Sequence, residues 1–281
     1  MNGSWDVLVD GLARPEAPCP DGAGGLWFSE IAAACAIMRL DPDGSVHTVC
    51  AGRAHVGGIV PHADGGLVAS GPTVAVIDRQ GVARDVLDAD GGWGFNDITT
   101  DAVGNVFAGK HAERPQMKPP AVEASLWRVG TDSIATHCYD GILMTNGLRV
   151  SPDGSRLYHA DTLRELVWVS DLDDAGLPQH RRVHYVLRTG MPDGMAIDEA
   201  GCVWIAAIGA GAVVRVAPNG TMDRVVEVPR SYVSAVCFGG ADRRELIVTA
   251  FGGDPYDTDH AGCVLSMGVD VAGFPVPAAR V

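Results

Sequence analysis

A sequence plan that recurs along the chain is the feature that most limits its possible folds. In each copy a polar residue opens an apolar alternating run, a glycine turn follows, and a second apolar run carries an aromatic residue. The clearest copies are "NDITTDAVGNVFAG" from Asn96, "NGLRVSPDGSRLYHAD" from Asn146 and "DGMAIDEAGCVWIAA" from Asp193. The turn glycine lies eight residues after the polar residue in all three. Alternating runs joined by a glycine turn predict β-hairpins.

Weaker copies extend this repeat over the chain. The same eight-residue offset connects Gly24 to Glu16 and Gly66 to Gly58, and a copy with a longer turn begins near Ser234. The six starting positions are 38 to 50 residues apart. That period is typical of the four-stranded blade of a β-propeller.

The rest of each repeat also reads as strands. Two further strand-like stretches follow each hairpin, and no long helical periodicity is present. We therefore predict an all-β, six-bladed β-propeller with four antiparallel strands per blade, formed as a single domain over residues 1–281. The N-terminal "WDVLVD" is predicted to complete the last blade and close the ring. A two-sheet sandwich or a pair of smaller β domains is the alternative, but neither requires the period or the fixed offset.

Polar residues at one phase of the repeat are expected to meet. The first strand of each propeller blade lines the central channel, so Glu16, Asn96, Asn146 and Asp193 should converge at one mouth of that channel. Any one of them alone could instead cap a turn. Together, two carboxylates and two amides would be costly to bury unless a cation lay between them. Oxygen ligands suit Ca²⁺, Mg²⁺ or Mn²⁺.

The tripeptide Pro-Asp-Gly tests this assignment, because it occurs four times, at positions 20, 42, 152 and 192. Pro-Asp-Gly usually marks a turn. The repeat places Asp21, Asp43 and Asp153 in hairpin turns, and we predict that they only form turns. Asp193 instead opens a first strand, so it is the copy predicted to serve a functional site.

Composition excludes some partners. A formal net charge of -14 argues against nucleic acid and anionic membranes, which need a basic surface. The seven cysteines show no C-x-x-C spacing, and no signal sequence or apolar run of roughly 20 residues is visible. We expect a cytoplasmic protein with reduced cysteines and no nucleic-acid or membrane partner, and leave its oligomeric state open.

The chain resembles the SMP-30/gluconolactonase/luciferin-regenerating enzyme family over nearly its whole length. The resemblance lies in "RPEAP", "FNDITTDAVGNVFAG", "TNGLRVSPDGSRLYHADT" and "MPDGMAIDEAGCVWIA". It implies that Glu16, Asn146 and Asp193 bind one divalent metal ion. Ca²⁺ is the expected ion, with Mn²⁺, Mg²⁺, Zn²⁺ or Fe²⁺ as alternatives. The resemblance further implies that Asn96 contacts the substrate or a metal-bound water, and that Asp193 is the catalytic general base.

The activity that the resemblance implies is metal-dependent hydrolysis of a small-molecule lactone. A cation would polarise the ring carbonyl and activate water, so no nucleophilic side chain is required. Accordingly, the chain has no "GxSxG" elbow. Metal-bound hydroxide is the alternative to Asp193 as the base. Ester hydrolysis or isomerisation at the same site, or a noncatalytic calcium-binding propeller, are the other functions considered.

Departures from the family pattern concern the substrate. The family often carries an arginine two residues before the asparagine of the third blade, where this chain has Gly94 between Trp93 and Phe95. A donor to sugar hydroxyls is therefore lost, and we expect a flatter or less hydroxylated lactone that contacts Trp93 and Phe95. Alternatively, Lys110 and His111 supply the polar contacts.

Three further segments carry expectations. Ala17 stands where the family usually has glycine, so we expect a restricted backbone there. The proline-rich stretch 111–124 is long for a propeller connection and is predicted to form part of a lid. The acidic stretch 252–262 is predicted to be an exposed connection, with a cover over the channel mouth or a second cation site as the alternatives.

Overall fold

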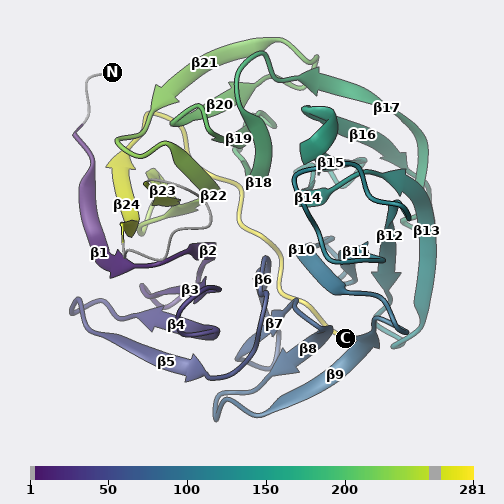
Figure 1. Cartoon of the computed structure of the whole chain (residues 1–281), viewed down its shortest axis with the longest axis horizontal. Helices are drawn as coiled ribbons and strands as arrows, with labels where there is room; N and C mark the ends of the chain where they lie inside the picture. The colour runs from purple at the N-terminus through teal and green to yellow at the C-terminus, as the bar shows by residue number, and fades with distance from the viewer. Residues whose placement is uncertain (1–3, 253–260) are drawn as a thin grey trace.

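The chain forms a ring of six sheets around a central axis (Figure 1). The computed structural model describes residues 4–252 and 261–281. Within them, each sheet has four strands, and neighbouring strands pair antiparallel. The predicted six-bladed all-β propeller is therefore confirmed, and the sandwich alternative is excluded.

The strands of each blade follow one another from the centre of the ring outward (Figure 1). Blade 1 contains β2 (Pro15–Pro20), β3 (Leu26–Glu30), β4 (Ala36–Leu40) and β5 (Val46–Cys50); blade 2 contains β6 (Ile59–Pro61), β7 (Leu67–Ala69), β8 (Thr73–Ile77) and β9 (Ala83–Asp88). Blade 3 contains β10 (Gly94–Thr100), β11 (Val106–His111), β12 (Ala124–Val129) and β13 (Ala135–Ile142); blade 4 contains β14 (Thr145–Val150), β15 (Arg156–Asp161), β16 (Leu166–Leu172) and β17 (Pro178–Val186). Blade 5 contains β18 (Met191–Ile197), β19 (Val203–Ile208), β20 (Ala212–Val216) and β21 (Met222–Glu227); blade 6 contains β22 (Tyr232–Gly239), β23 (Glu245–Phe251), β24 (Gly262–Gly268) and β1 (Asp6–Leu12).

The N-terminal strand closes the ring as predicted. β1 pairs antiparallel with β24, with Asp6 opposite Ser266 and Leu12 opposite Gly262. The last blade thus takes its outermost strand from the start of the chain. The pairing leaves β24 without an open edge and joins the first strand of the chain to the last.

The innermost strands carry a β-bulge that fixes the phase of the repeat. Asn96, Asn146 and Asp193 all lie in these bulges, between matched pairs of the hairpin ladder. Glu16 does not, because it pairs with Ser29 immediately before the bulge of β2. Its predicted phase is therefore wrong by one residue, and Ala17 occupies the matching position.

Ala17 explains part of this difference. Its φ angle is 51°, in the left-handed region that glycine adopts without strain. The restricted backbone that we expected at this alanine is therefore present. A left-handed residue at a bulge locally redirects the strand, so blade 1 presents its residues differently from blades 3, 4 and 5.

The core lies between neighbouring sheets. The indole of Trp204 on β19 is fully buried and meets Phe238 of β22 edge-on, with 5.5 Å between the ring centroids. Similar apolar clusters fill the other blade junctions. Since each first strand packs between two neighbours, the positions of side chains at the channel mouth are set by contacts between blades.

A C-terminal segment crosses the centre of the ring (Figure 1). Its Gly273 bridges to Asp198, just after β18, and Ala279 bridges to His62, just after β6. The Arg280 amide also donates to the Gly104 carbonyl in the β10–β11 turn, at 2.9 Å. These contacts lie where the innermost strands end, so the segment covers the end of the channel opposite Asn96, Asn146 and Asp193.

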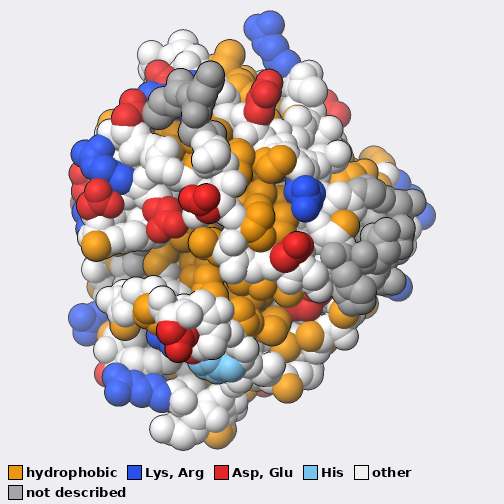
Figure 2. Space-filling view, turned by 90° about the vertical axis from the view of Figure 1, so that its left-hand side faces the viewer, with side chains coloured by type: hydrophobic (Ala, Val, Ile, Leu, Met, Phe, Trp, Pro, Cys, Tyr) orange, Lys and Arg blue, Asp and Glu red, His pale blue; other side chains and the backbone are white. Residues whose placement is uncertain are grey.

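The outer face of blades 1 and 6 is of mixed character. Figure 2 shows its basic side chains scattered singly among acidic and apolar ones. In the part of the chain that the structure describes, no helix has the length and hydropathy to cross a bilayer. Most of the acidic stretch 252–262 lies outside the described residues.

Candidate functional site

Two carboxylates from different blades meet near the channel axis. Asp193 on β18 is buried, and Glu16 on β2 is half-buried. Burial raises the pKa of Asp193 well above its usual range, and the charge of Glu16 raises it further. Burial likewise raises the pKa of Glu16 to about 8, with a smaller contribution from Asp97. Asp193 and Glu16 are thus close enough to repel each other, although Glu16 lies one residue out of phase.

A chain of hydrogen bonds orients the side-chain amides of Asn96 and Asn146. The Asn96 Nδ2 donates to the Thr145 carbonyl at 2.8 Å and to Asn146 Oδ1 at 3.1 Å. The Asn146 Nδ2 donates to Thr162 Oγ1 at 3.2 Å, and that hydroxyl donates to the Pro192 carbonyl at 2.8 Å. The bond to Thr162 fixes which end of the Asn146 amide is the oxygen. That oxygen accepts one hydrogen bond from Asn96, and its second lone pair can serve a ligand.

Asp97 is a third carboxylate that the sequence did not assign to the site. It is 5% exposed, and accepts hydrogen bonds from the amides of Ile98 at 2.7 Å and Leu148 at 3.1 Å. Burial raises its pKa, whereas Arg149, 3.8 Å away, lowers it. Its place next to Asn96 in the same bulge could have drawn attention to it. Through its bond to the Leu148 amide, Asp97 connects β10 to β14, and it adds a negative charge near the mouth of the channel.

Glycines allow the first strands to approach closely. A Cβ atom on Gly57 would collide with Asn96 Oδ1, and one on Gly147 would collide with the Asp193 carbonyl oxygen. A larger residue at Gly147 would push β14 and β18 apart, and one at Gly57 would displace the Asn96 side chain. The convergence of the polar side chains therefore depends on close backbone contacts between neighbouring blades.

The donor chemistry of this site fits a hard divalent cation. Glu16 and Asp193 supply two carboxylates and Asn146 supplies an oriented amide oxygen. Their raised pKa values are the expected result when carboxylates are buried together without a positive charge. Within residues 4–252 and 261–281, no three His, Cys, Asp or Glu side chains gather as a metal site. A cation here would therefore depend on Asn146.

The other Pro-Asp-Gly aspartates form turns, as predicted. Asp153 accepts hydrogen bonds from Ser151 Oγ at 2.6 Å and from the Ser155 amide at 3.0 Å. These bonds lower the pKa of Asp153 to about 2. Asp21 and Asp43 accept comparable bonds from backbone amides in their own turns. Asp21 also forms an ion pair with Arg39, whose Nε donates to Asp21 Oδ2 at 2.9 Å, so the prediction that it only forms a turn is wrong. Asp193 alone among the four is buried at the channel mouth.

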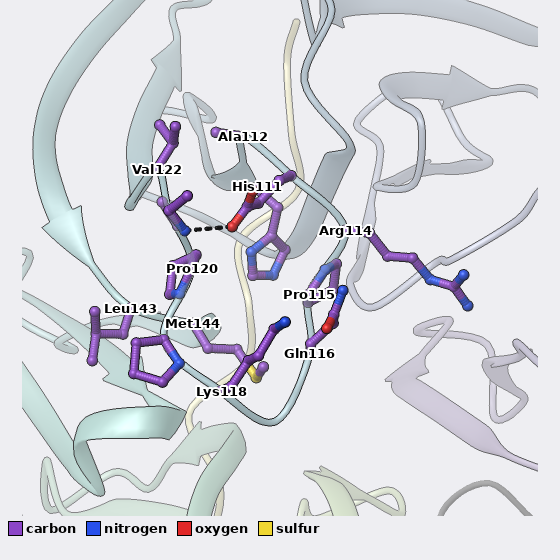
Figure 3. A pocket seen from close by; sticks show the side chains of 14 residues that line it. His111, Ala112, Arg114, Pro115, Gln116, Lys118, Pro120, Val122, Leu143 and Met144 are labelled. Atoms are coloured by element: carbon purple, nitrogen blue, oxygen red, sulfur yellow. Dashed lines mark hydrogen bonds between the residues drawn. The ribbon is translucent and has the colours of Figure 1, made fainter.

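A cavity of about 510 Å³ adjoins the mouth beneath residues 112–123 (Figure 3). His111, at the end of β11, and Met144, two residues before Asn146, contribute to its lining. The proline-rich segment itself forms one side of the cavity. A lid role for this segment stays a prediction.

The aromatic and cationic residues predicted to bind substrate have different surroundings. Trp93 is half-buried and contacts His55, with 4.7 Å between ring centroids, and Arg114, whose guanidinium lies 5.6 Å from the indole ring. Phe95 is buried in the apolar cluster between blades 2 and 3. The Lys110 ammonium lies 5.4 Å from the Trp127 ring. Of these predicted residues, His111 alone lines the cavity.

Gly94 occupies a position that no other residue fits well. Its φ angle is 140°, and a Cβ atom there would lie 2.5 Å from the Gly71 carbonyl oxygen. We therefore expect Gly94→Ala to lower the free energy of unfolding by about 3 kcal/mol, because it combines backbone strain with a collision. Chemical denaturation of the two proteins measures this loss.

Gly91→Ala is the matched control for this variant. Gly91 also has a positive φ, of 75°, but nothing lies within 4 Å of its added Cβ atom. Its loss should be about 1 kcal/mol, from backbone strain alone. Equal losses in the two variants would contradict the role of the contact with Gly71.

Comparison with known sequences adds a family match. The sequence model described as the SMP-30/Gluconolactonase/LRE-like region matches residues 14–252. The chain is 30% identical over 273 residues to a 6-deoxy-6-sulfogluconolactonase of Pseudomonas putida, a match that covers 90% of this chain and 89% of that protein. It is 31% identical over 256 residues to the pentonolactonase XacC of Haloferax volcanii, with 85% of each chain covered.

Comparison with solved structures supports the same architecture. A luciferin-regenerating enzyme superposes over 100% of both chains with a TM-score of 0.87, at 21% sequence identity. At that identity the similarity concerns the fold. The blade arrangement is thus shared with a solved propeller over the full length.

Proposed function

The chain belongs to the SMP-30/gluconolactonase/LRE-like family, and on that basis we propose that it is a divalent-metal-dependent hydrolase that opens a lactone ring. Two relatives that align with most of this chain are named as lactonases. Their names specify different sugar lactones, so the lactone ring is the chemistry they share. The proposal extends that chemistry to this chain.

The observation that supports the proposal is that Glu16 and Asn146, from two other blades, both act on the Asp193 carboxylate, the first through its charge and the second through a hydrogen bond. Two of these side chains are carboxylates with raised pKa values, and the third is an amide whose nitrogen is held by Thr162. These three residues would hold the cation. When bound, a divalent cation supplies Lewis acidity that polarises a carbonyl and makes water more acidic.

The protein's own groups then perform defined tasks. Asp193 accepts the proton of the attacking water on one of its two carboxylate oxygens. Asn96 has its Nδ2 on the Thr145 carbonyl and Asn146 Oδ1, so it fixes the edge of the site next to the substrate. Thr162 and the Pro192 carbonyl hold Asn146 in place. Pre-set positions of this kind reduce the reorganisation needed during reaction.

The substrate is a lactone with fewer hydroxyl groups than a sugar lactone, or a flatter one. Gly94 leaves no side chain where the family often has arginine, and its contact with Gly71 leaves no room for one. Trp93 offers a half-buried aromatic surface nearby. Such a site favours planar apolar contact over a network of hydroxyl hydrogen bonds.

A metal-replacement assay tests the function. The protein is stripped with a chelator, Ca²⁺, Mn²⁺, Mg²⁺, Zn²⁺ or Fe²⁺ is added back singly, and proton release is followed on a panel of γ- and δ-lactones. We expect negligible turnover after stripping and recovery with at least one ion, because Lewis acidity is needed for ring opening. Aryl esters are included to detect ester hydrolysis. Failure of every ion to support lactone turnover would contradict the proposal.

A further inference from the structure

The cavity beneath residues 112–123 contains a buried polar atom with no partner. His111 is 6% exposed, and its Nε2 forms no hydrogen bond within the described residues. Burial lowers the pKa of His111 to about 4, so its imidazole is neutral near pH 7. A buried nitrogen without a partner is destabilising, and such atoms often mark a place for a ligand. Figure 3 shows the His111 ring among the lining side chains.

The charged side chains around this cavity are mostly basic. They are Glu113, Arg114 and Lys118. The Glu113 carboxylate is already occupied, since it accepts a hydrogen bond from the Ala121 amide at 2.6 Å. Among the described residues, neither Arg114 nor Lys118 forms an ion pair with a carboxylate. In a chain with a net charge of -14, these two cations without a carboxylate partner give the cavity a local positive charge.

The two cations are placed differently. In Figure 3 the Lys118 ammonium points toward the centre of the lining, whereas Arg114 extends away from it. Arg114 lies over Trp93, next to the mouth. Lys118 and His111 can therefore contact one group inside the cavity, and Arg114 can add positive charge along the path from the mouth.

We propose that this cavity binds an anionic substituent of the lactone, with a carboxylate as the matching group. Lys118 supplies the opposite charge to the carboxylate. The neutral His111 ring has one N–H, which is engaged by the Thr145 carbonyl, so its Nε2 accepts a hydrogen bond from a hydroxyl or water next to the bound carboxylate. Met144 and His111 place the cavity beside Asn146 and Asn96, so the ring carbonyl and the anionic group bind in adjacent sites of one molecule. This inference rests on the proposed lactone hydrolysis and specifies its substrate class.

The test compares γ-butyrolactone-γ-carboxylate with its primary amide, which has the same ring without the charge. We expect the wild-type protein to hydrolyse the carboxylate with a kcat/KM about 10-fold higher than the amide. The double variant Arg114→Gln/Lys118→Gln should lose this preference and keep its activity on the amide. Arg79→Gln removes a charge from an exposed turn outside the cavity lining, and it should keep the preference.

His111→Phe separates a binding role from a structural one. The ring volume is retained and the unpartnered nitrogen is lost, so the melting temperature should stay unchanged or rise. Its kcat/KM for the carboxylate should fall about 10-fold. A lower melting temperature with equal losses on both lactones would instead make His111 structural and overturn its assignment.

Calorimetric titration of both lactones into metal-stripped protein distinguishes the two proposals. Tighter binding of the carboxylate that disappears in the double variant supports the cavity assignment, even if neither lactone is hydrolysed. Combined with no turnover of the lactone panel by any added ion, that result would refute lactone hydrolysis and leave the cavity assignment standing. Equal hydrolysis and equal binding of the two lactones would refute the anionic subsite and leave the hydrolase proposal standing.

Discussion

Asp193→Asn is expected to lower kcat/KM on any lactone that the protein hydrolyses by about 10³-fold or more, since one residue serves as both metal ligand and base. Asparagine has the same shape, so packing around β18 is preserved. The change also removes a carboxyl group whose ionised form is disfavoured in the folded protein, because burial and Glu16 raise its pKa. The metal-stripped variant should consequently melt at a higher temperature than metal-stripped wild-type protein. Steady-state kinetics and thermal unfolding measure the two effects.

Asp153→Asn is the matched control, because it changes another Pro-Asp-Gly aspartate. Asp153 is exposed and bonded to Ser151 and Ser155 within its own turn. Activity should stay within about twofold of wild type, and the loss of stability should be about 1 kcal/mol. If the two variants lost activity to the same degree, Asp193 would have no special role.

The response of stability to pH should change when metal is bound. Burial raises the pKa of Glu16 to about 8 from a model-compound value of 4.5, so the metal-free folded state holds a proton that the unfolded state releases. Folding therefore takes up protons between these two pH values. The contribution of Glu16 to stability is accordingly full below pH 4.5 and is lost as the pH rises toward 8. The loss is of the order of a few kcal/mol.

Metal binding should reverse this trend, because a cation stabilises the ionised carboxylates. The increase in melting temperature on adding Ca²⁺ should thus grow from pH 5.5 to pH 8. The comparison is made at each pH with and without the ion, since buried histidines also affect stability. Burial lowers the pKa values of His111 and His184 to about 4. These histidines therefore stay neutral in the folded state while the unfolded state takes up protons, and the protein loses stability as the pH falls below 6.5.

Glu16→Gln provides the control for this experiment. It removes the titrating group, so the metal-free variant should lack the corresponding loss of stability between pH 5.5 and pH 8. A metal effect in the wild-type protein that is constant with pH would show that proton release from the site does not accompany binding.

The sequence was sufficient for the parts of the molecule that depend on local spacing. A hairpin has a fixed number of residues between its bulge and its turn, so the eight-residue offset located Asn96, Asn146 and Asp193 correctly in three blades. The period gave the number of blades for the same reason. The distinction between Asp193 and Asp153 also followed, because one lies in the bulge of a first strand and the other lies in a turn.

Only the tertiary structure decided how residues from different blades meet. The bulge of β2 is displaced at Ala17, so counting residues assigned Glu16 the wrong phase although its charge still reaches Asp193. Contacts of Asp97 across to β14, the support of Asn146 by Thr162, the cavity at His111 and the C-terminal segment across the channel all join residues distant in the chain. Such contacts depend on packing between sheets, which has no fixed spacing along the sequence.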